Sequence, residues 1–203
     1  SINWTIPESF YNEMTDVSYR IGTMYCDTYS GDTYIGTTTA QFRVNVPTDI
    51  GPTFEVTFAE GDAEVAAVTG GNYFLKYISD AKYTITATAS YGATVKGYSI
   101  RNGDTTLTTA SGIFPNVSSA YYYVTVTDSR GLSTTKTVSK PIQDYTKTTC
   151  NLWLKSVDPD GTVVMGVDGQ CFSRDFYGAG QENTFSLSVS CEAPDGTITT
   201  LQG

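Results

Sequence analysis

The sequence predicts an all-β fold, and two observations lead to this prediction. Apolar and polar residues alternate with a period of two along most of the chain, whereas helical periodicity is nearly absent. The composition agrees, because the chain contains 15 tyrosines and many threonines, which favour a pleated surface where side chains pack across strands. The same composition argues against a helical bundle.

The charge balance argues against two classes of partner. The chain of 203 residues has 12 basic and 21 acidic side chains and a net charge of −9. Binding to nucleic acid depends on neutralising phosphates with basic side chains, so we expect no nucleic-acid partner, and adhesion to polyanionic surfaces is disfavoured as well. No apolar run approaches the ~20 residues of a membrane-spanning helix, so we expect no membrane insertion.

The first strong strand signal is a hairpin near the N-terminus. The segment Met24–Pro47 consists of an alternating strand, a turn at Gly31 and a second alternating strand, and it leads into the junction VPTDIGP. Cys26 lies in the first alternating run, and we expect it to be a small buried hydrophobic residue.

Six or seven strands are predicted from Pro52 to about Tyr145, roughly the size and spacing of one immunoglobulin-like sandwich. Alternation marks strands in PTFEVTFAE, KYTITATAS and KGYSIRNG, with a turn at Asn102–Gly103. A hairpin follows that reverses at Asp128–Gly131 and returns as STTKTVSKPI. We expect this core to contain Phe54, Val56, Phe58, Tyr83, Ile85, Ala87, Ala89, Tyr98, Ile100, Tyr122, Val124 and Val126.

Two interpretations of Tyr122 remain open. It stands two residues before Val124, at the place where immunoglobulin-like sandwiches often carry a corner tyrosine ahead of a core cysteine. The alternative is an ordinary tyrosine that packs across strands.

The hairpin signal recurs at an offset of 100 residues, because Met24 aligns with Val124 and Gly31 with Gly131. Far less chain precedes the first hairpin than the second. We therefore predict tandem immunoglobulin-like antiparallel β-sandwiches: a partial module at residues 1–50, a complete one at 51–145 and a partial one at 146–203. Such a chain would be a segment of a longer tandem array of modules.

This organisation predicts apolar faces at both ends of the chain, which monomeric proteins rarely tolerate. We expect either that the two partial modules pair or that the chain associates with itself. The residues expected on these faces are Phe42, Val44, Val46, Trp153, Val163, Phe185 and Leu187.

The four cysteines do not form a metal-binding pattern. No two of them form a CxxC pair, and with no histidine a zinc site would need all four thiolates from distant segments. One disulfide can form among Cys150, Cys171 and Cys191, although we expect reduced cysteines.

No catalytic, cofactor-binding or metal-binding residues are predicted, so we expect a protein that is not an enzyme. A nucleophile activated by histidine is impossible in a chain without histidine. The acidic pairs Glu60/Asp62 and Asp158/Asp160 lie in turns, where solvated carboxylates titrate normally. The segment Asp158–Gly161, with Asp168 beyond it, is better explained as a type I turn than as a calcium site.

Three other features of the sequence resemble binding signals. Tyr91, Tyr121, Tyr123 and Trp153 are candidates for stacking against sugars, although strand aromatics more often pack across strands. The glycosylation sequons at Asn3 and Asn116 are discounted, because we expect a prokaryotic or viral source. In Ser129–Gly131 the similarity to an adhesion tripeptide is explained by the turn's need for glycine.

Several short segments are turn-like by themselves, but together they form an ordered set that spans nearly the whole chain. These segments are Trp4–Pro7, Thr28–Gly31 with Ile35–Gly36, Gly92–Val95 with Tyr98, Thr127–Gly131, Cys150, Asp160–Thr162, and Tyr177–Gly178 with Asn183–Thr184. The ordered set resembles a family of structural proteins from tailed siphophages of Gram-positive hosts and their prophages. Two departures stand out, since Thr149 precedes Cys150 in place of arginine and Tyr177 replaces the usual phenylalanine.

The resemblance implies tandem immunoglobulin-like modules in a tail or tail-tip protein, and it transfers no catalytic residue. The expected function is a non-enzymatic spacer or display module located in the virion and assembled in the host cytoplasm. Its expected partners are other tail proteins, a second copy of the chain or a host cell-surface glycan. The alternative is a bacterial surface adhesin or a carbohydrate-binding β-sandwich module at the cell surface.

Overall fold

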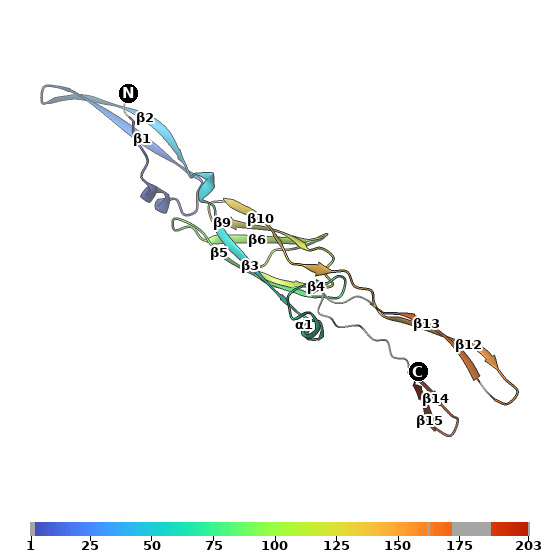
Figure 1. Cartoon of the computed structure of the whole chain (residues 1–203). Coiled ribbons are helices and arrows are strands. Elements are labelled where there is room, and N and C mark those ends of the chain that lie inside the picture. The colour runs from blue at the N-terminus through green and yellow to red at the C-terminus, as the bar shows by residue number, and fades with distance from the viewer. Residues whose placement is uncertain (1–2, 162, 172–187, 203) are drawn as a thin grey trace. The chain divides into compact units, whose positions relative to one another are not determined.

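A computed structural model describes residues 3–161, 163–171 and 188–202, and strands dominate these residues, which confirms the all-β prediction. The chain divides into two compact units, Ser1–Ile142 and Gln143–Gly203. Figure 1 shows both units and labels most of their elements.

The elements before the sandwich are η1 (Glu8–Glu13), β1 (Tyr19–Ser30), β2 (Thr33–Asn45) and η2 (Thr48–Ile50). Those that follow are β3 (Thr53–Glu60), α1 (Ala63–Thr69), β4 (Phe74–Leu75), β5 (Ala81–Thr88), β6 (Val95–Asn102), β7 (Thr105–Leu107), β8 (Ser111–Phe114), β9 (Tyr121–Asp128), β10 (Ser133–Ser139) and β11 (Ile142–Gln143).

Strands β1 and β2 form the predicted hairpin as a two-stranded antiparallel sheet. The chain reverses after Ser30, where Gly31 has a φ of 58°, a left-handed conformation that favours glycine. Opposite Phe42 the first strand carries Gly22, and a Cβ atom there would lie 2.4 Å from the Phe42 ring. The aromatic ring therefore covers the backbone of the facing glycine.

A small apolar cluster lies beside the base of this hairpin. Met14, Val44 and Val46 are buried, with Phe42, Ile50 and Leu132 among the partly buried residues packed against them. The expectation that Phe42, Val44 and Val46 form an exposed face is therefore wrong, because the segment before β1 brings Met14 onto them. Periodicity could not reveal this cover, since that segment contains no strand.

Two sheets pack face to face as the central sandwich (Figure 1), with strand orders β3-β5-β8 and β10-β9-β6-β7. Phe58 of the first sheet and Tyr122 of the second have ring centroids 4.4 Å apart. Most of the predicted core is confirmed: Phe54, Tyr83, Ile85, Ile100, Tyr122, Val124 and Val126 are buried, and Val56, Phe58, Ala87 and Tyr98 pack against them. Ala89 is the exception, because β5 ends at Thr88 and Ala89 is not part of this cluster.

Tyr122 is a core tyrosine and not a corner tyrosine. Its side chain is fully buried, and its hydroxyl has no hydrogen-bond partner among the described residues. A corner tyrosine would donate that hydroxyl to nearby backbone.

The predicted turn at Asn102–Gly103 is confirmed at Gly103, which has a φ of 55°. Asn102 instead ends β6 with a buried side chain, whose Nδ2 donates to the carbonyls of Ser119 (2.8 Å) and Tyr121 (3.0 Å). The amide thus ties the end of β6 to the segment that enters β9.

Helix α1 was not predicted from the sequence. The Asp62 carboxylate caps it by accepting from the backbone N–H groups of Glu64 (2.8 Å) and Val65 (3.1 Å), and Gly70 ends it in a left-handed conformation. A helix of 7 residues is too short for its periodicity to stand out.

The described part of the second unit forms two hairpins, β12 (Thr149–Val157) with β13 (Val163–Gln170), and β14 (Ser188–Glu192) with β15 (Ile198–Gln202). Trp153 faces Gly166, where a Cβ atom would lie 2.3 Å from the indole, so this hairpin also places an aromatic ring over a glycine. The predicted exposure of Trp153 and Val163 is confirmed. Phe185 and Leu187 lie outside the described residues.

Candidate interaction surfaces

The T-D-S-R-G segment, Thr127–Gly131, forms a buried ionic junction at the tip of the β9–β10 hairpin. Arg130 Nη2 and Nε donate to Asp128 Oδ2 at 2.7 and 2.9 Å, and neither side chain is exposed. Asp128 Oδ1 accepts from the backbone N–H groups of Arg130 (3.0 Å) and Leu132 (2.9 Å). The turn was predicted, and Gly131 has the φ of 87° that it requires, but the burial of Arg130 was not.

This junction also joins segments that are distant in the sequence. Arg130 Nη2 donates to the Ile50 carbonyl at 3.3 Å, and the Ser129 hydroxyl donates to the Thr15 carbonyl. The Ser129 oxygen in turn accepts from the backbone N–H of Thr94 at 3.1 Å. Two of the motifs that carried the resemblance, G-A-T-V and T-D-S-R-G, therefore meet where the preceding segment contacts the sandwich.

Tyr91 belongs to the same region, so it is not a free sugar platform. It has a φ of 51°, is only half-exposed, and packs edge-on against Tyr11 with ring centroids 5.8 Å apart. The nearby Glu8 carboxylate, followed by partial burial, raises the pKa of Tyr91 above its ordinary value.

Tyr121 and Tyr123 lie on the outer face of the four-stranded sheet, because strand residues two apart share a face. Their exposed fractions are 57% and 45%. The Arg101 guanidinium lies 4.6 Å from the centre of the Tyr123 ring, and the Thr125 and Thr135 hydroxyls are 2.8 Å apart on the neighbouring strands. The structure thus brings together two of the four predicted sugar-stacking residues, on a face rich in hydroxyl groups.

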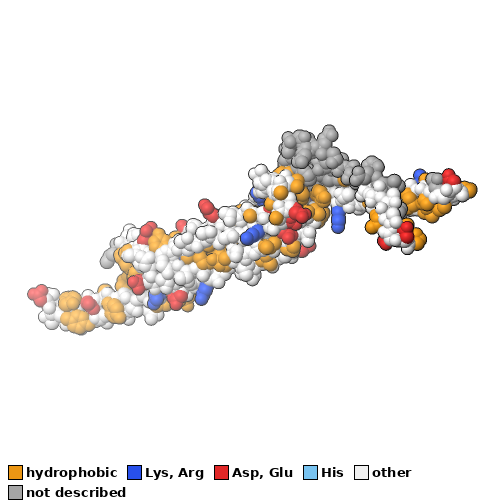
Figure 2. Space-filling model, turned by 90° about the horizontal axis from the view of Figure 1, so that it is seen from below, with side chains coloured by type: hydrophobic (Ala, Val, Ile, Leu, Met, Phe, Trp, Pro, Cys, Tyr) orange, Lys and Arg blue, Asp and Glu red, His pale blue; other side chains and the backbone are white. Residues whose placement is uncertain are grey.

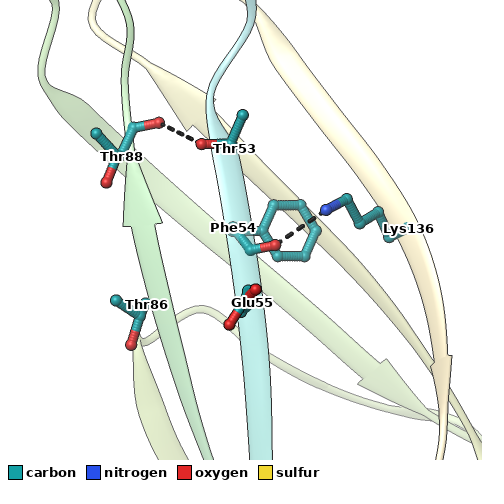
Figure 3. Close-up of a pocket in the computed structure, with 6 residues that line it drawn as sticks. All are labelled: Thr53, Phe54, Glu55, Thr86, Thr88 and Lys136. Atoms are coloured by element: carbon teal, nitrogen blue, oxygen red, sulfur yellow. Dashed lines mark hydrogen bonds between the residues drawn. The ribbon is translucent and has the colours of Figure 1, made fainter.

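A shallow open groove lies between the edges of the two sheets and is shown in Figure 3. Lys136 of β10 reaches across to β3, where its Nζ donates to the Phe54 carbonyl at 3.0 Å and lies 4.8 Å from the centre of the Phe54 ring. A lysine placed in this way occupies backbone that another strand could otherwise pair with. We interpret this groove as a protected sheet edge.

The two long hairpins carry the main exposed apolar surface. On β1–β2, large side chains that are more than half exposed include Ile21, Met24, Tyr25, Tyr29, Tyr34 and Ile35. On β12–β13, Leu152, Trp153, Leu154, Val157 and Val163 are exposed by 46% or more. Orange apolar side chains are visible on both hairpins in Figure 2.

The acidic candidates have structural roles. Glu60 Oε1 accepts from the backbone N–H groups of Asp62 (3.1 Å) and Asp80 (2.8 Å), and its other oxygen is buried, so Glu60 is not the solvated turn carboxylate that was expected. Asp158 starts the predicted turn, in which Gly161 donates its N–H to the Asp158 carbonyl at 2.9 Å. In the described part of the chain, no group of acidic, cysteine or histidine side chains is arranged to hold a metal ion.

The cysteines differ from the expectation in one respect. Cys26 is exposed and not buried, because the distal part of the β1–β2 hairpin has no packing layer over it. Cys150 and Cys171 are free thiols, and Cys191 lies in β14. Within the described ranges, no helix is long and apolar enough to cross a membrane.

Comparison with known protein families identifies the kind of virus from which the chain comes. Residues 1–158 match a family described as "Siphovirus protein of unknown function (DUF859)". No curated protein and no solved structure matches the chain. The matched region contains the N-terminal hairpin, the whole sandwich and strand β12, which confirms the siphophage origin that the ordered motifs indicated. The chain belongs to this siphovirus protein family.

Proposed function

We propose that the chain is a non-enzymatic structural or display module of a phage tail or tail tip. The observation that supports this most directly is the pair of two-stranded hairpins with exposed apolar side chains. An isolated hairpin is at best marginally stable in water, and large exposed apolar patches mark interaction sites. In a siphovirus protein, an assembled virion supplies such partners.

The sandwich between the hairpins fits a role as a spacer. Its strand order, three strands packed on four, supports the immunoglobulin-like description of this module, and its edge is protected by Lys136. The tandem arrangement, with partial modules at 1–50 and 146–203, is part of the proposal. A Gram-positive host, assembly in its cytoplasm, and tail proteins as partners also belong to it.

Labelling of intact particles tests the location. Antibodies against the chain, bound to gold and imaged on purified phage by negative-stain electron microscopy, should label the tail or its tip. Labelling of the capsid, or no chain detected in purified virions by mass spectrometry, would contradict the proposal.

One observation favours a second function, that of a carbohydrate-binding module or adhesin. Tyr121 and Tyr123 are exposed side by side on a hydroxyl-rich sheet face, and exposed tyrosines can stack on sugar rings. Purified chain should then bind host cell-wall glycan, and a Tyr121→Ser/Tyr123→Ser variant should lose that binding. Equal binding by both proteins, or by neither, would leave this candidate without support.

A mass measurement addresses the adhesin class separately. Adhesins of this fold often carry an intramolecular bond from lysine to asparagine or aspartate, which lowers the intact mass by about 17 or 18. Here the Nζ groups of Lys136 and Lys140 donate to the backbone carbonyls of Phe54 (3.0 Å) and Gly71 (2.8 Å). These two lysines are thus engaged by backbone carbonyls. For a tail module we expect the unmodified mass, whereas a mass lower by about 17 or 18 would favour the adhesin.

A further inference from the structure

One face of the β1–β2 hairpin carries exposed tyrosines from its base to its tip, with polar rows between them, and we call it the tyrosine face. The strand register places Ile21 opposite Arg43, and Tyr25 opposite Thr39, on this face. Its large side chains are Tyr19, Ile21, Tyr25, Tyr29 and Tyr34, with exposed fractions of 45, 54, 68, 57 and 54%. The opposite face differs, because at its base Val44 is buried against Met14.

The tyrosine face is large enough to hold a partner. Strands of 12 and 13 residues, at about 3.3 Å per residue and with about 5 Å between strands, give a face of roughly 40 by 10 Å. The face combines these apolar side chains with polar rows such as Thr23/Gln41 and Asp27/Thr37, and exposed patches of several hundred Å² on monomeric proteins are often functional. The face continues over all six rows of side chains, so one elongated partner surface could cover it.

The charges on the hairpin favour a second copy of the chain as the partner. Residues 19–45 carry Arg20, Asp27, Asp32 and Arg43, which sum to zero (2 − 2), although the whole chain has a net charge of −9. On the tyrosine face, Arg43 lies near the base and Asp27 near the tip. A hairpin with an acidic end and a basic end is complementary to itself when two copies run in opposite directions.

The register gives the centre of this arrangement. Arg43 lies opposite Ile21, and Asp27 lies opposite Thr37, so the midpoint between the two charges falls between Thr23 and Tyr25. A two-fold axis there places Arg43 of each copy over the row of Asp27 and Thr37 of the other. The Thr37 hydroxyl already donates to the Asp27 carboxylate, which keeps this acceptor on the strand that the arginine would approach.

We propose that the tyrosine face binds the same face of a second copy of this chain in the opposite orientation, with Arg43 of each copy against Asp27 of the other. The parallel orientation would set like charges against each other, which is destabilising. This inference rests on the proposed structural role, because it names a partner for that role.

The β12–β13 hairpin provides a matched control. Residues 149–170 carry one lysine, Lys155, and three aspartates, Asp158, Asp160 and Asp168, a sum of −2 (1 − 3). Two copies of that hairpin would repel each other, so its exposed Leu152 is a suitable site for a substitution that leaves the proposed dimer unchanged.

Sedimentation equilibrium of the full chain, with reducing agent to prevent disulfides through Cys26, tests the contact. We expect a reversible dimer that weakens as salt is added. Asp27→Arg and Arg43→Asp should each raise the dissociation constant about tenfold, and the double variant should return it close to the original value. Leu152→Ser should have no effect, and circular dichroism should confirm that every variant is folded.

Several results would overturn the inference. These are a monomer at all concentrations, a trimer or larger species, single variants that dimerise normally, a double variant that is not restored, or dissociation by Leu152→Ser. A monomer that still labels the phage tail would contradict this inference alone. A dimer absent from virions would contradict the proposed function alone.

Discussion

At the scale of single residues, the Asp128–Arg130 pair has the largest expected effect on stability. Both side chains are buried, and the carboxylate accepts hydrogen bonds from the Arg130 side chain and from two backbone N–H groups. Removing one member of a buried ion pair leaves the other charge uncompensated away from water. The pair therefore makes the hairpin tip sensitive to a single substitution.

We predict that Arg130→Ala lowers the free energy of unfolding by about 3–5 kcal/mol. Urea denaturation followed by circular dichroism measures this change. The matched control is Arg101→Ala, which removes an exposed arginine and should cost less than about 1 kcal/mol. Equal losses for the two variants would mean that Arg130 is solvated and the junction is not formed.

Tyr122 leads to a prediction about alkaline pH. Burial, with a smaller contribution from the Glu60 carboxylate, raises the pKa of Tyr122 well above the ordinary value of about 10. The unfolded chain would release this proton near pH 10 while the folded chain retains it. The stability from this group is therefore complete below pH 10 and decreases above it, by up to about 1.4 kcal/mol per pH unit.

Tyr122→Phe should remove the part of the stability loss at alkaline pH that comes from the Tyr122 hydroxyl. At pH 7 it should change stability by less than about 1 kcal/mol, because the hydroxyl has no hydrogen-bond partner among the described residues. Denaturation curves at pH 7 and pH 11 measure both effects. A large loss at pH 7 would indicate that the hydroxyl makes a structural hydrogen bond, as a corner tyrosine does.

At the scale of elements, the strands could be predicted from the sequence, but the segments that pack over their faces could not. Alternation in β3, β5, β6 and β9 identified the core, since each strand buries the same apolar face that the period of two defines. Both predicted hairpins also form, with left-handed glycines at Gly31 and Gly131. Yet Val124 is fully buried while its counterpart Met24 is 60% exposed, because alternation defines two faces without saying which one is covered.

Helix α1 is an element that the sequence pattern did not reveal. Its capping residues, Asp62 and Gly70, were visible signals, but 7 residues of AEVAAVT do not display a helical period.

We predict that Asp62→Ala costs about 1 kcal/mol of stability, since two backbone N–H groups lose their acceptor. In thermal unfolding, the melting temperature of Asp62→Asn should stay close to that of the original protein, because asparagine also caps helices. If Asp62→Ala and Asp62→Asn lose the same stability, the capping role is contradicted.

At the scale of the whole molecule, the sandwich should fold without the segment before it, although less stably. Its buried core residues all lie between Phe54 and Val126, so none of them comes from residues 1–51. That segment nevertheless supplies the Ile50 carbonyl to Arg130, the Thr15 carbonyl to Ser129, and the cluster against which Leu132 packs. The sequence did not predict these contacts, because each joins residues far apart in the chain.

We predict that a fragment of residues 52–145 unfolds cooperatively but is about 2–4 kcal/mol less stable than a fragment of residues 1–145. The expected loss combines two hydrogen bonds at about 1 kcal/mol each with the exposure of part of Leu132. Urea denaturation of both fragments measures the difference, and Arg130→Ala should destabilise both, because its Asp128 partner lies within the shorter one. Equal stability of the two fragments would mean that residues 1–51 do not dock on the sandwich. If the fragment of residues 52–145 does not unfold cooperatively, the sandwich is incomplete without residues 1–51.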